Sequence, residues 1–503
     1  MTISIGPSGV TRDDVVAVAR HAAPVSLSDA ARGAIRRSAE LIDAASASPT
    51  PVYGVSTGFG SLANTVIPAD RREELQRALI RSHAAGMGPP VEDEVVRAMM
   101  LLRARTLAMG YSGVRPVVVE TMLAMLNAGV VPPVYEHGSL GASGDLAPLA
   151  HVAMALIGEG DTATVTALAA AGIEPITLRA KEGLALINGT DGMLGMLVLA
   201  IADLDRILRT ADIAAAMSVE ALLGTDRAFA EDLMALRPHP GQTASAANLR
   251  RLLAGSAIVA SHRVGDSRVQ DAYSLRCAPQ VNGAARDAVD NARRTADIEL
   301  RSAIDNPTVL PDGRVESCGH FHGAPVALAC DILAIASADV GAIAERRTDR
   351  LLDRTRSQGL PPFLVDDAGV NSGLMIVQYT QAAMVAENRR LAVPASVDTI
   401  PTSAMQEDHV SMGWAAARKL RRSVANLARI VACELVAAAR GVEMRTPLAP
   451  SAATGAAVDA LREAGVGGAG PDRWQAPELA AATDAVTSGA VLTAVEAAIG
   501  PLA

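Results

Sequence analysis

The sequence predicts a mostly α protein, in which a long up-and-down helical bundle follows a smaller, loop-rich N-terminal domain. Residues with high helix propensity dominate, because alanine is abundant and aromatic residues make up only 2% of the chain. From residue 192 onward, long segments repeat apolar residues with helical spacing. Polar loops that contain glycine separate these segments, as they do at the ends of a helical bundle.

The first 191 residues hold the shorter elements. Thr2 to Ile5 predicts a short strand. Helical spacing predicts helices over residues 12–22, 27–45, 71–83, 91–109, 116–127 and 146–157. Either Ser26 or Ser28 would cap the second of these helices. Residues 161–181 are weakly patterned and could hold a short hairpin.

The rest of the chain predicts longer helices. Their patterns cover residues 193–223, 244–261, 284–300, 324–354, 376–391 and 412–440. Polar loops at residues 269–283, 318–325 and 401–413 lie between them. We therefore divide the chain into an N-terminal domain, residues 1–191, which we expect to be the catalytic part, and a helical bundle, residues 192–503.

Charge and composition argue against several classes of function. The chain has 45 Lys and Arg against 54 Asp and Glu, a formal net charge of −9, and no basic stripe that would bind nucleic acid. The most apolar long run, residues 193–207, contains charged residues and reads as a buried helix rather than a membrane span. The first residues lack the pattern of a secretory signal. We expect a cytoplasmic protein with no nucleic-acid or membrane partner and with four free cysteines.

Aromatic residues are scarce and unevenly placed. Of the five tyrosines and four phenylalanines, Tyr53, Phe59, Tyr273 and Phe321 lie in polar segments that contain glycine. Packing roles would place them in the apolar helical stripes, so their distribution indicates a site. The segment of residues 51–64, PVYGVSTGFGSLAN, is poor in helix formers, and we interpret it as an ordered loop.

One stretch, residues 138–151 with the sequence GSLGASGDLAPLAH, allows an unusual reaction. Ala142, Ser143 and Gly144 are small enough to let the backbone fold back sharply. The amide nitrogen of Gly144 could then attack the carbonyl carbon of Ala142 and close a five-membered ring with loss of water. Loss of the Ser143 hydroxyl as a second water would give a methylidene-imidazolone, an electrophile that no ordinary side chain supplies. The alternative is a glycine-rich loop between helices.

The whole stretch resembles the signature of the aromatic amino acid ammonia-lyases, which build this electrophile from Ala-Ser-Gly. Asp145 and the Leu-Ala-Pro-Leu that follows it match the signature as well. The resemblance covers about residues 50–445. It implies that Ala142, Ser143 and Gly144 form a covalent 5-methylidene-imidazol-4-one, with no metal and no dissociable cofactor.

Separate loops offer the other groups that such a reaction needs. Arg276 in YSLR is a candidate for a bidentate contact to a substrate carboxylate, and Asn188 could hydrogen-bond the carboxylate or the electrophile. Tyr53 is a candidate base for the β-proton if the site lowers its pKa. Glu407 could bind an imidazole or carry a proton. Taken alone, Asn188 reads as a turn residue and Glu407 equally well as a surface charge.

The same loops resemble the histidine-specific members of the family. The pair Ser82-His83 has the form found in those members, where the His binds the imidazole of the substrate. Gln270 and Gln280 match polar residues that flank YSLR. The resemblance assigns catalysis to Tyr53, Ala142, Ser143, Gly144, Tyr273 and Glu407. It assigns substrate binding to His83, Asn188, Gln270, Arg276 and Phe321.

Three positions depart from the family pattern. Met405 stands where Asn is common before QEDHVSM, His320 where Asn is common before Phe-His, and Asp191 where Gln commonly follows NGT. None of them removes a group with a chemical role, but each could alter hydrogen bonds behind the site. Cys318, His320 and His322 are spaced like metal ligands, but their loop already has a role in the family, so we expect no metal.

The resemblance implies the non-oxidative deamination of L-histidine to trans-urocanate and ammonia. It also implies a homotetramer whose active sites take loops from three chains, with the helical bundle in the oligomer core. Whether the electrophile captures the amine or the imidazole stays open. One alternative is an ammonia-lyase or 2,3-aminomutase for tyrosine or phenylalanine, although an apolar ring would leave His83 and Glu407 unpaired. The other is an inactive helical scaffold, against which the intact set of catalytic residues argues.

Overall fold

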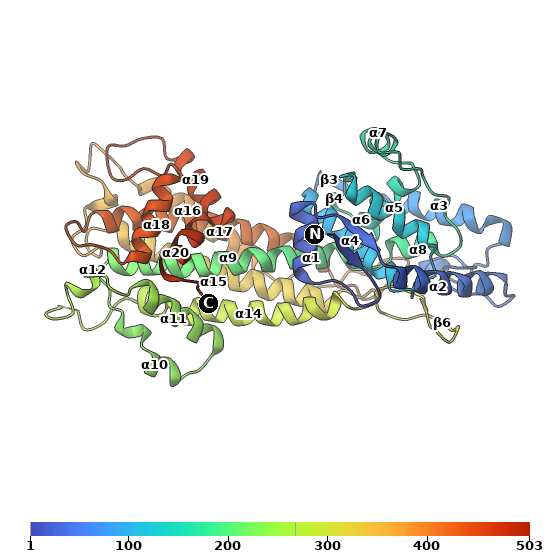
Figure 1. The fold of residues 1–503 in the computed structure, drawn as a ribbon, viewed down its shortest axis with the longest axis horizontal. Helices are drawn as coiled ribbons and strands as arrows, with labels where there is room; N and C mark the ends of the chain where they lie inside the picture. The colour runs from blue at the N-terminus through green and yellow to red at the C-terminus, as the bar shows by residue number, and fades with distance from the viewer. Residues whose placement is uncertain (1, 267) are drawn as a thin grey trace. The chain divides into compact units, whose positions relative to one another are not determined.

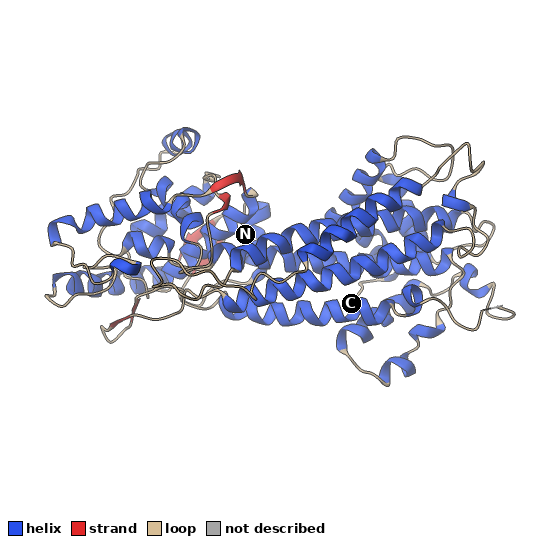
Figure 2. Ribbon diagram, turned by 180° about the vertical axis from the view of Figure 1, so that it is seen from behind, coloured by secondary structure: helices blue, strands red, loops and turns tan. Residues whose placement is uncertain are grey.

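Helices dominate the structure, a computed structural model that describes residues 2–266 and 268–503 (Figure 1). The few strands are short (Figure 2). These features confirm the prediction of a mostly α protein with long helices. Backbone contacts divide the chain into two compact units, which we describe separately. Unit 1 comprises Met1–Leu199, Arg293–Asp331 and Pro394–Lys419, and unit 2 comprises Ala200–Ala292, Ile332–Val393 and Leu420–Ala503.

Unit 1 holds the shorter elements and three two-stranded sheets. Strand β1 (Ile3–Ile5) pairs in parallel with β2 (Val25–Leu27). The antiparallel pairs are β3 (Met87–Pro90) with β4 (Tyr135–His137), and β5 (Thr308–Val309) with β6 (Val315–Glu316). The helices up to residue 187 are α1 (Arg12–His21), α2 (Asp29–Ala47), α3 (Arg72–His83), α4 (Asp93–Ala108), α5 (Pro116–Asn127), α6 (Leu146–Leu156), α7 (Thr162–Ala170) and α8 (Glu182–Ile187).

Local capping explains where several of these helices begin. Thr11 accepts from the Asp14 amide, and Asp14 in turn accepts from the Thr11 amide, which forms a capping box at the start of α1. Ser28, not Ser26, caps α2 by accepting from the Ala31 amide. The hairpin that residues 161–181 could hold is not formed, because the Asp161 side chain accepts from the Thr164 amide at 3.0 Å and starts α7.

The rest of the chain contains the longest helices together with several short ones. They are α9 (Asp191–Ala221), α10 (Glu231–Ala235), α11 (Pro240–Leu252), α12 (Ala257–Ala260), α13 (Tyr273–Arg276), α14 (Ala278–Glu299), α15 (Ala324–Leu352), α16 (Met375–Leu391), α17 (Gly413–Glu443), α18 (Ala452–Glu463), α19 (Ala476–Ser488) and α20 (Ala490–Ile499). The helix predicted over residues 244–261 is wrong, since Gly255 has a φ of +77° and separates α11 from α12.

The predicted domain boundary after residue 191 stays a prediction. Each compact unit gathers stretches from distant parts of the sequence, and helices α9, α14, α15 and α17 contain residues of both units. Two segments are long and apolar enough to cross a membrane by length and composition, Glu182–Ala221 and Ala324–Leu352. The most apolar window of the first is fully buried and that of the second is 56% buried, and core helices of globular proteins meet the same criteria.

Candidate active site

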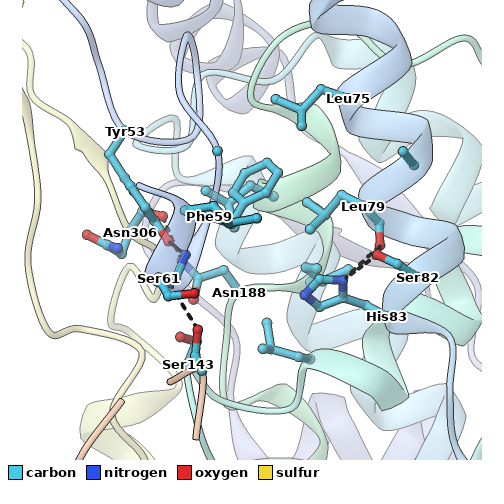
Figure 3. A pocket seen from close by; sticks show the side chains of 18 of the residues that line it. Tyr53, Phe59, Ser61, Leu75, Leu79, Ser82, His83, Ser143, Asn188 and Asn306 are labelled. Atoms are coloured by element: carbon cyan, nitrogen blue, oxygen red, sulfur yellow. Dashed lines mark hydrogen bonds between the residues drawn. The ribbon is translucent and has the colours of Figure 1, made fainter. Parts of the chain in front are cut away.

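A cavity of about 470 Å³ in unit 1 brings together residues from several distant stretches of the chain (Figure 3). Of the residues predicted for the site, those that line it are Tyr53, His83, Ser143, Asn188 and Glu407. Much of the remaining wall is apolar, formed by Phe59, Leu75, Leu79, Leu146, Leu184 and Ile187. The cavity therefore combines a few polar groups with an apolar wall, as small-molecule sites do.

The Ala142-Ser143-Gly144 segment forms a tight turn at this cavity. Gly141 and Gly144 pair as an isolated antiparallel bridge, so the chain reverses over Ala142 and Ser143. Ser143 has a φ of +51° and Gly144 a φ of +84°, both in the left-handed region. A Cβ added to Gly144 would lie 2.1 Å from the carbonyl oxygen of Gly189. The turn therefore requires glycine at position 144.

Asp145 anchors this turn to the start of α9. Its amide donates to the Gly189 carbonyl at 2.7 Å, and its Oδ2 accepts from the amides of Gly192 and Met193 at 3.0 and 2.9 Å. Its Oδ1 accepts from Ser139 Oγ at 2.8 Å. Burial raises the pKa of Asp145 to about 7, although these hydrogen bonds act to lower it. Four contacts thus hold the residue that follows the turn.

Tyr53 presents its hydroxyl to the cavity from the loop of residues 51–64. The hydroxyl oxygen accepts from the Gly60 amide at 3.2 Å. Within one chain, burial raises the pKa of Tyr53 more than the Gly60 hydrogen bond lowers it, so these groups alone do not meet the condition set for a base. The negative charge of Glu407 raises the pKa further.

His83 ends α3 with a defined tautomer. Its Nδ1 lies 2.9 Å from the carbonyl oxygen of Leu79, which can only accept, so Nδ1 carries the proton. Ser82 Oγ lies 3.0 Å from the same nitrogen (Figure 3). Burial lowers the pKa of His83 and keeps the ring neutral. The remaining nitrogen, Nε2, is therefore a hydrogen-bond acceptor.

Glu407 lies in a turn that contacts the Tyr53 loop. It forms an isolated bridge with Thr402, whose Oγ1 donates to Glu407 Oε2 at 2.8 Å. Ser403 Oγ accepts from the Ser61 amide at 3.0 Å and so ties the turn to the loop of residues 51–64. His83 Nε2 and the Glu407 carboxylate are thus acceptors at a cavity whose wall is largely apolar.

Other predicted residues lie elsewhere in the chain. Gln270, Tyr273 and Arg276 belong to unit 2, where they line a second cavity of about 330 Å³. The Arg276 guanidinium lies 4.6 Å from the centre of the Tyr273 ring, and Tyr273 is 72% exposed. Phe321 is part of unit 1 but is not among the residues that line the first cavity.

The family of the chain follows from its sequence match. The family described as aromatic amino acid lyase matches residues 10–463. The chain belongs to the aromatic amino acid lyase family.

Individual relatives within this family are similar over their whole length. The chain is 62% identical to the histidine ammonia-lyase of Streptomyces griseus and 61% identical to that of Streptomyces avermitilis, with complete coverage of both chains in each case. Its fold matches the tyrosine aminomutase from Streptomyces globisporus with a TM-score of 0.94, at 38% identity over 99% of each chain. It matches histidine ammonia-lyase from Trypanosoma cruzi with a TM-score of 0.90, at 40% identity over 99% of this chain and 96% of the other.

Sequence reasoning missed several polar residues at the cavity. Ser61, Ser403 and Asn306 line it, and only Asn306, in an Asp-Asn-Pro turn, carries a signal that the sequence could have offered. In the described part of the chain, no group of three or more His, Cys, Asp or Glu residues is placed to hold a metal ion. The Cys318 thiol instead donates to the Asp305 carbonyl at 3.4 Å.

The turn before Glu407 predicts a stabilising substitution. Ser403, Ala404 and Met405 have φ values of +49°, +52° and +69°, a region that asparagine tolerates better than methionine. Met405 is 67% exposed, so little packing would be lost on replacing it. Met405→Asn is expected to stabilise the protein by about 0.5–1 kcal/mol, measured as a rise in thermal midpoint. Met405→Leu is the control, and an equal rise in both variants would refute the backbone explanation.

Proposed function

We propose that this member of the aromatic amino acid lyase family deaminates L-histidine without oxidation, giving trans-urocanate and ammonia. The observation that carries the proposal is the cavity in which the Ala142-Ser143-Gly144 turn shares walls with two hydrogen-bond acceptors, His83 Nε2 and Glu407. The high identity to two histidine ammonia-lyases over complete chains supports the same substrate.

The Ala142-Ser143-Gly144 turn is proposed to carry a covalent 5-methylidene-imidazol-4-one, formed from these residues with loss of two waters. The left-handed φ of Ser143 and the close approach of Gly144 to the Gly189 carbonyl support this fit, because cyclisation needs a sharp turn with no side chain at position 144. When formed, the group supplies an electrophile that captures the substrate, most simply at its amine, and makes that nitrogen a better leaving group. The proposal requires no metal and no dissociable cofactor.

The polar groups of the cavity are proposed to select an imidazole ring. A neutral imidazole has one N–H donor and an imidazolium has two. His83 Nε2 and the Glu407 carboxylate can accept hydrogen bonds from these donors, while Leu79 and the other apolar side chains contact the ring faces. A phenyl ring would occupy the same space and leave both acceptors unpaired.

Tyr53 is proposed to remove the β-proton of the bound substrate. Its oxygen already accepts from the Gly60 amide, so a backbone donor is in place to stabilise a phenolate. Because burial raises the pKa of Tyr53 within one chain, the proposal needs a further positive group in the assembled site. Arg276 of a sister chain can supply that charge and can bind the substrate carboxylate with its two-pronged guanidinium.

A homotetramer with shared active sites is therefore part of the proposal. Gln270, Tyr273 and Arg276 of unit 2 would complete the cavity of a sister chain, with Phe321 from another. Exposed apolar residues support such an assembly, since Leu328, Ile332 and Ile335 recur with helical spacing on α15 and are each about half exposed. We place the enzyme in the cytoplasm, with L-histidine as its small-molecule partner and with no nucleic-acid or membrane partner.

A tyrosine or phenylalanine ammonia-lyase or aminomutase is the alternative, and the fold match to a tyrosine aminomutase keeps it in view. The wild type is expected to prefer L-histidine strongly in kcat/KM over L-phenylalanine and L-tyrosine. His83→Leu should lower kcat/KM for L-histidine by about tenfold or more, because an acceptor is lost from a buried site. Absorbance of the three deaminated products measures the preference, and chromatography of the β-amino acids detects an aminomutase.

The control for this prediction is a substitution of a histidine outside the cavity. His137→Leu changes an exposed residue of β4 and should leave the ratio of the three substrates unaltered. Comparable turnover of L-phenylalanine and L-histidine by the wild type would contradict the assignment of His83 and Glu407.

A further inference from the structure

A fully buried ion pair lies behind the cavity, and no step proposed above uses it. Lys181 Nζ contacts Asp305 Oδ2 at 2.7 Å, and the side chains are 0% and 2% exposed. Lys181 precedes α8 with a left-handed φ of +72°, a conformation that lysine adopts at a cost. The cost of removing two charges from water offsets most of what a buried ion pair adds to the free energy of unfolding. A role in fixing the conformation of neighbouring side chains is therefore favoured over a role in stability.

Asn188 connects this ion pair to the cavity. Its Nδ2 donates to the carbonyl oxygen of Asn306 at 2.6 Å and to Asp305 Oδ1 at 3.4 Å. Its Oδ1 is buried and has no hydrogen-bond partner among the residues that the structure describes. Asn188 also lines the cavity, together with Ser143 (Figure 3).

The chemistry of the partners fixes the orientation of the Asn188 amide. A carbonyl oxygen and an ionised carboxylate can only accept, so the NH₂ group must face Asn306 and Asp305. Both oxygens of Asp305 already act as acceptors, because Oδ2 accepts from Lys181 Nζ and Oδ1 accepts from the Asn306 amide, each at 2.7 Å. The side-chain oxygen of Asn188 is thereby left as its only group for a ligand.

The main chain around Asn188 is held separately. Arg103 Nη1 donates to the Asn188 carbonyl at 2.9 Å, and its Nη2 donates to the Ile304 carbonyl at 2.7 Å. Arg103 therefore holds the backbone at residues 188 and 304 through hydrogen bonds that do not involve the side chains of Lys181 and Asp305. A change at Asp305 therefore acts on the side-chain amide of Asn188 rather than on the position of its backbone.

We infer that Lys181 and Asp305 are positioning residues that present Asn188 Oδ1 to the substrate as a hydrogen-bond acceptor, so that Asn188 binds the amine rather than the carboxylate. This differs from the sequence-based expectation, in which Asn188 hydrogen-bonds the carboxylate or the electrophile, because the donors of its amide are already used. The inference rests on the proposed function for the identity of the ligand, an aromatic α-amino acid. The ammonium group of such a ligand has N–H donors that can hydrogen-bond Asn188 Oδ1.

Two ligands, one without the carboxylate and one without the amine, show which of these groups Asn188 binds. L-histidinol keeps the amine and lacks the carboxylate, whereas 3-(imidazol-4-yl)propionate keeps the carboxylate and lacks the amine. Binding is measured by calorimetry in a Ser143→Ala background, so that no covalent capture contributes. Asp305→Asn removes the charge and allows the new amide to donate to Asn188 Oδ1. Asp305→Asn is expected to lower the affinity for L-histidinol by about 10-fold to 100-fold, while the affinity for 3-(imidazol-4-yl)propionate changes little.

A double variant keeps the test independent of stability. Lys181→Met with Asp305→Leu replaces the ion pair by apolar groups, which commonly preserves the fold. It is expected to remain folded and still to lose affinity for L-histidinol, whereas a purely structural pair would leave binding intact. Asp331→Asn is the matched control, because Asp331 pairs with Lys419 in the same unit and is not bonded to Asn188. It should leave both ligands unaffected.

Three results would overturn the inference: equal weakening of both ligands by Asp305→Asn, weakening of the propionate alone, or unchanged L-histidinol binding in the double variant. If the wild type deaminates tyrosine instead of histidine, the proposed function fails on its own. The same comparison with L-tyrosinol and 3-(4-hydroxyphenyl)propionate then still tests the roles of Lys181 and Asp305.

Discussion

Ser143→Ala is expected to yield a folded protein that has lost nearly all deaminase activity. The Ser143 hydroxyl leaves as water when the proposed electrophile forms, and alanine has no group that could leave. The substitution removes one oxygen from a turn whose shape depends on the glycines at 141 and 144 and on the Asp145 anchor. The loss should therefore appear in kcat, with little change in thermal midpoint.

Intact-mass measurement separates this explanation from a simple binding defect. The wild-type chain is expected to be lighter than its sequence by two waters, and Ser143→Ala should lack the methylidene that the second loss creates. Ser139→Ala is a useful comparison, because Ser139 donates to Asp145 but does not belong to the triplet. It should lower the yield of modified chain while the modified fraction retains activity. An active wild-type sample with the unmodified mass would contradict the proposal that Ala142, Ser143 and Gly144 form the electrophile.

Tyr53→Phe is expected to lower kcat by roughly 100-fold or more, the scale of a lost general base. The ring would remain and keep its edge-to-face contact with Phe59, whose centre lies 6.4 Å away, so KM should change little. Only the ionised form of Tyr53 can accept a proton, and this form becomes more abundant as pH rises. Wild-type kcat should therefore increase with pH on the alkaline side, and Tyr53→Phe should lose this increase.

The control for Tyr53 is another tyrosine of unit 1. Tyr111→Phe alters a residue outside the cavity and should leave both kcat and its pH profile unchanged. The electrophile should still form in Tyr53→Phe, as intact mass on the same sample can verify. Near-normal turnover by Tyr53→Phe would transfer the role of base to Glu407 or Tyr273.

Much of the fold could be predicted because its signals are local. The helix predicted over residues 116–127 coincides with α5, where Pro116 occupies the first helical position. The α7 helix was missed because its run of alanine and threonine has almost no amphipathic pattern, and its Asp161 cap is a single residue. Gly255 is a residue that commonly ends helices. The apolar helical spacing on both sides of it nevertheless predicted one continuous helix.

The candidate site shows where sequence reasoning stops. Tyr53, His83 and Ser143 belong to motifs with chemical meaning, and the cavity brings them together. The sequence could not show that Lys181 and Asp305 form a buried pair, since their partnership spans more than a hundred residues and depends on the packed fold. The same holds for the pKa of Tyr53, because burial is a property of the tertiary structure.

A charged stretch in unit 2 gives a second example. Residues 345–356 carry many charges, a pattern typical of a solvated helix end. Arg347 within this stretch is nevertheless fully buried, and its Nη2 donates to Glu434 at 2.8 Å. A charge is buried only where a partner is present, and this partner comes from a helix that lies far along the chain.

The central claim is tested most directly by adding L-histidine to the purified wild-type protein and following the ultraviolet absorbance of trans-urocanate, with ammonia measured in parallel. The account predicts equal amounts of urocanate and ammonia at a rate proportional to enzyme concentration, and no product from the Ser143→Ala variant. A wild-type sample whose mass shows the loss of two waters but which releases no urocanate from L-histidine would contradict the account.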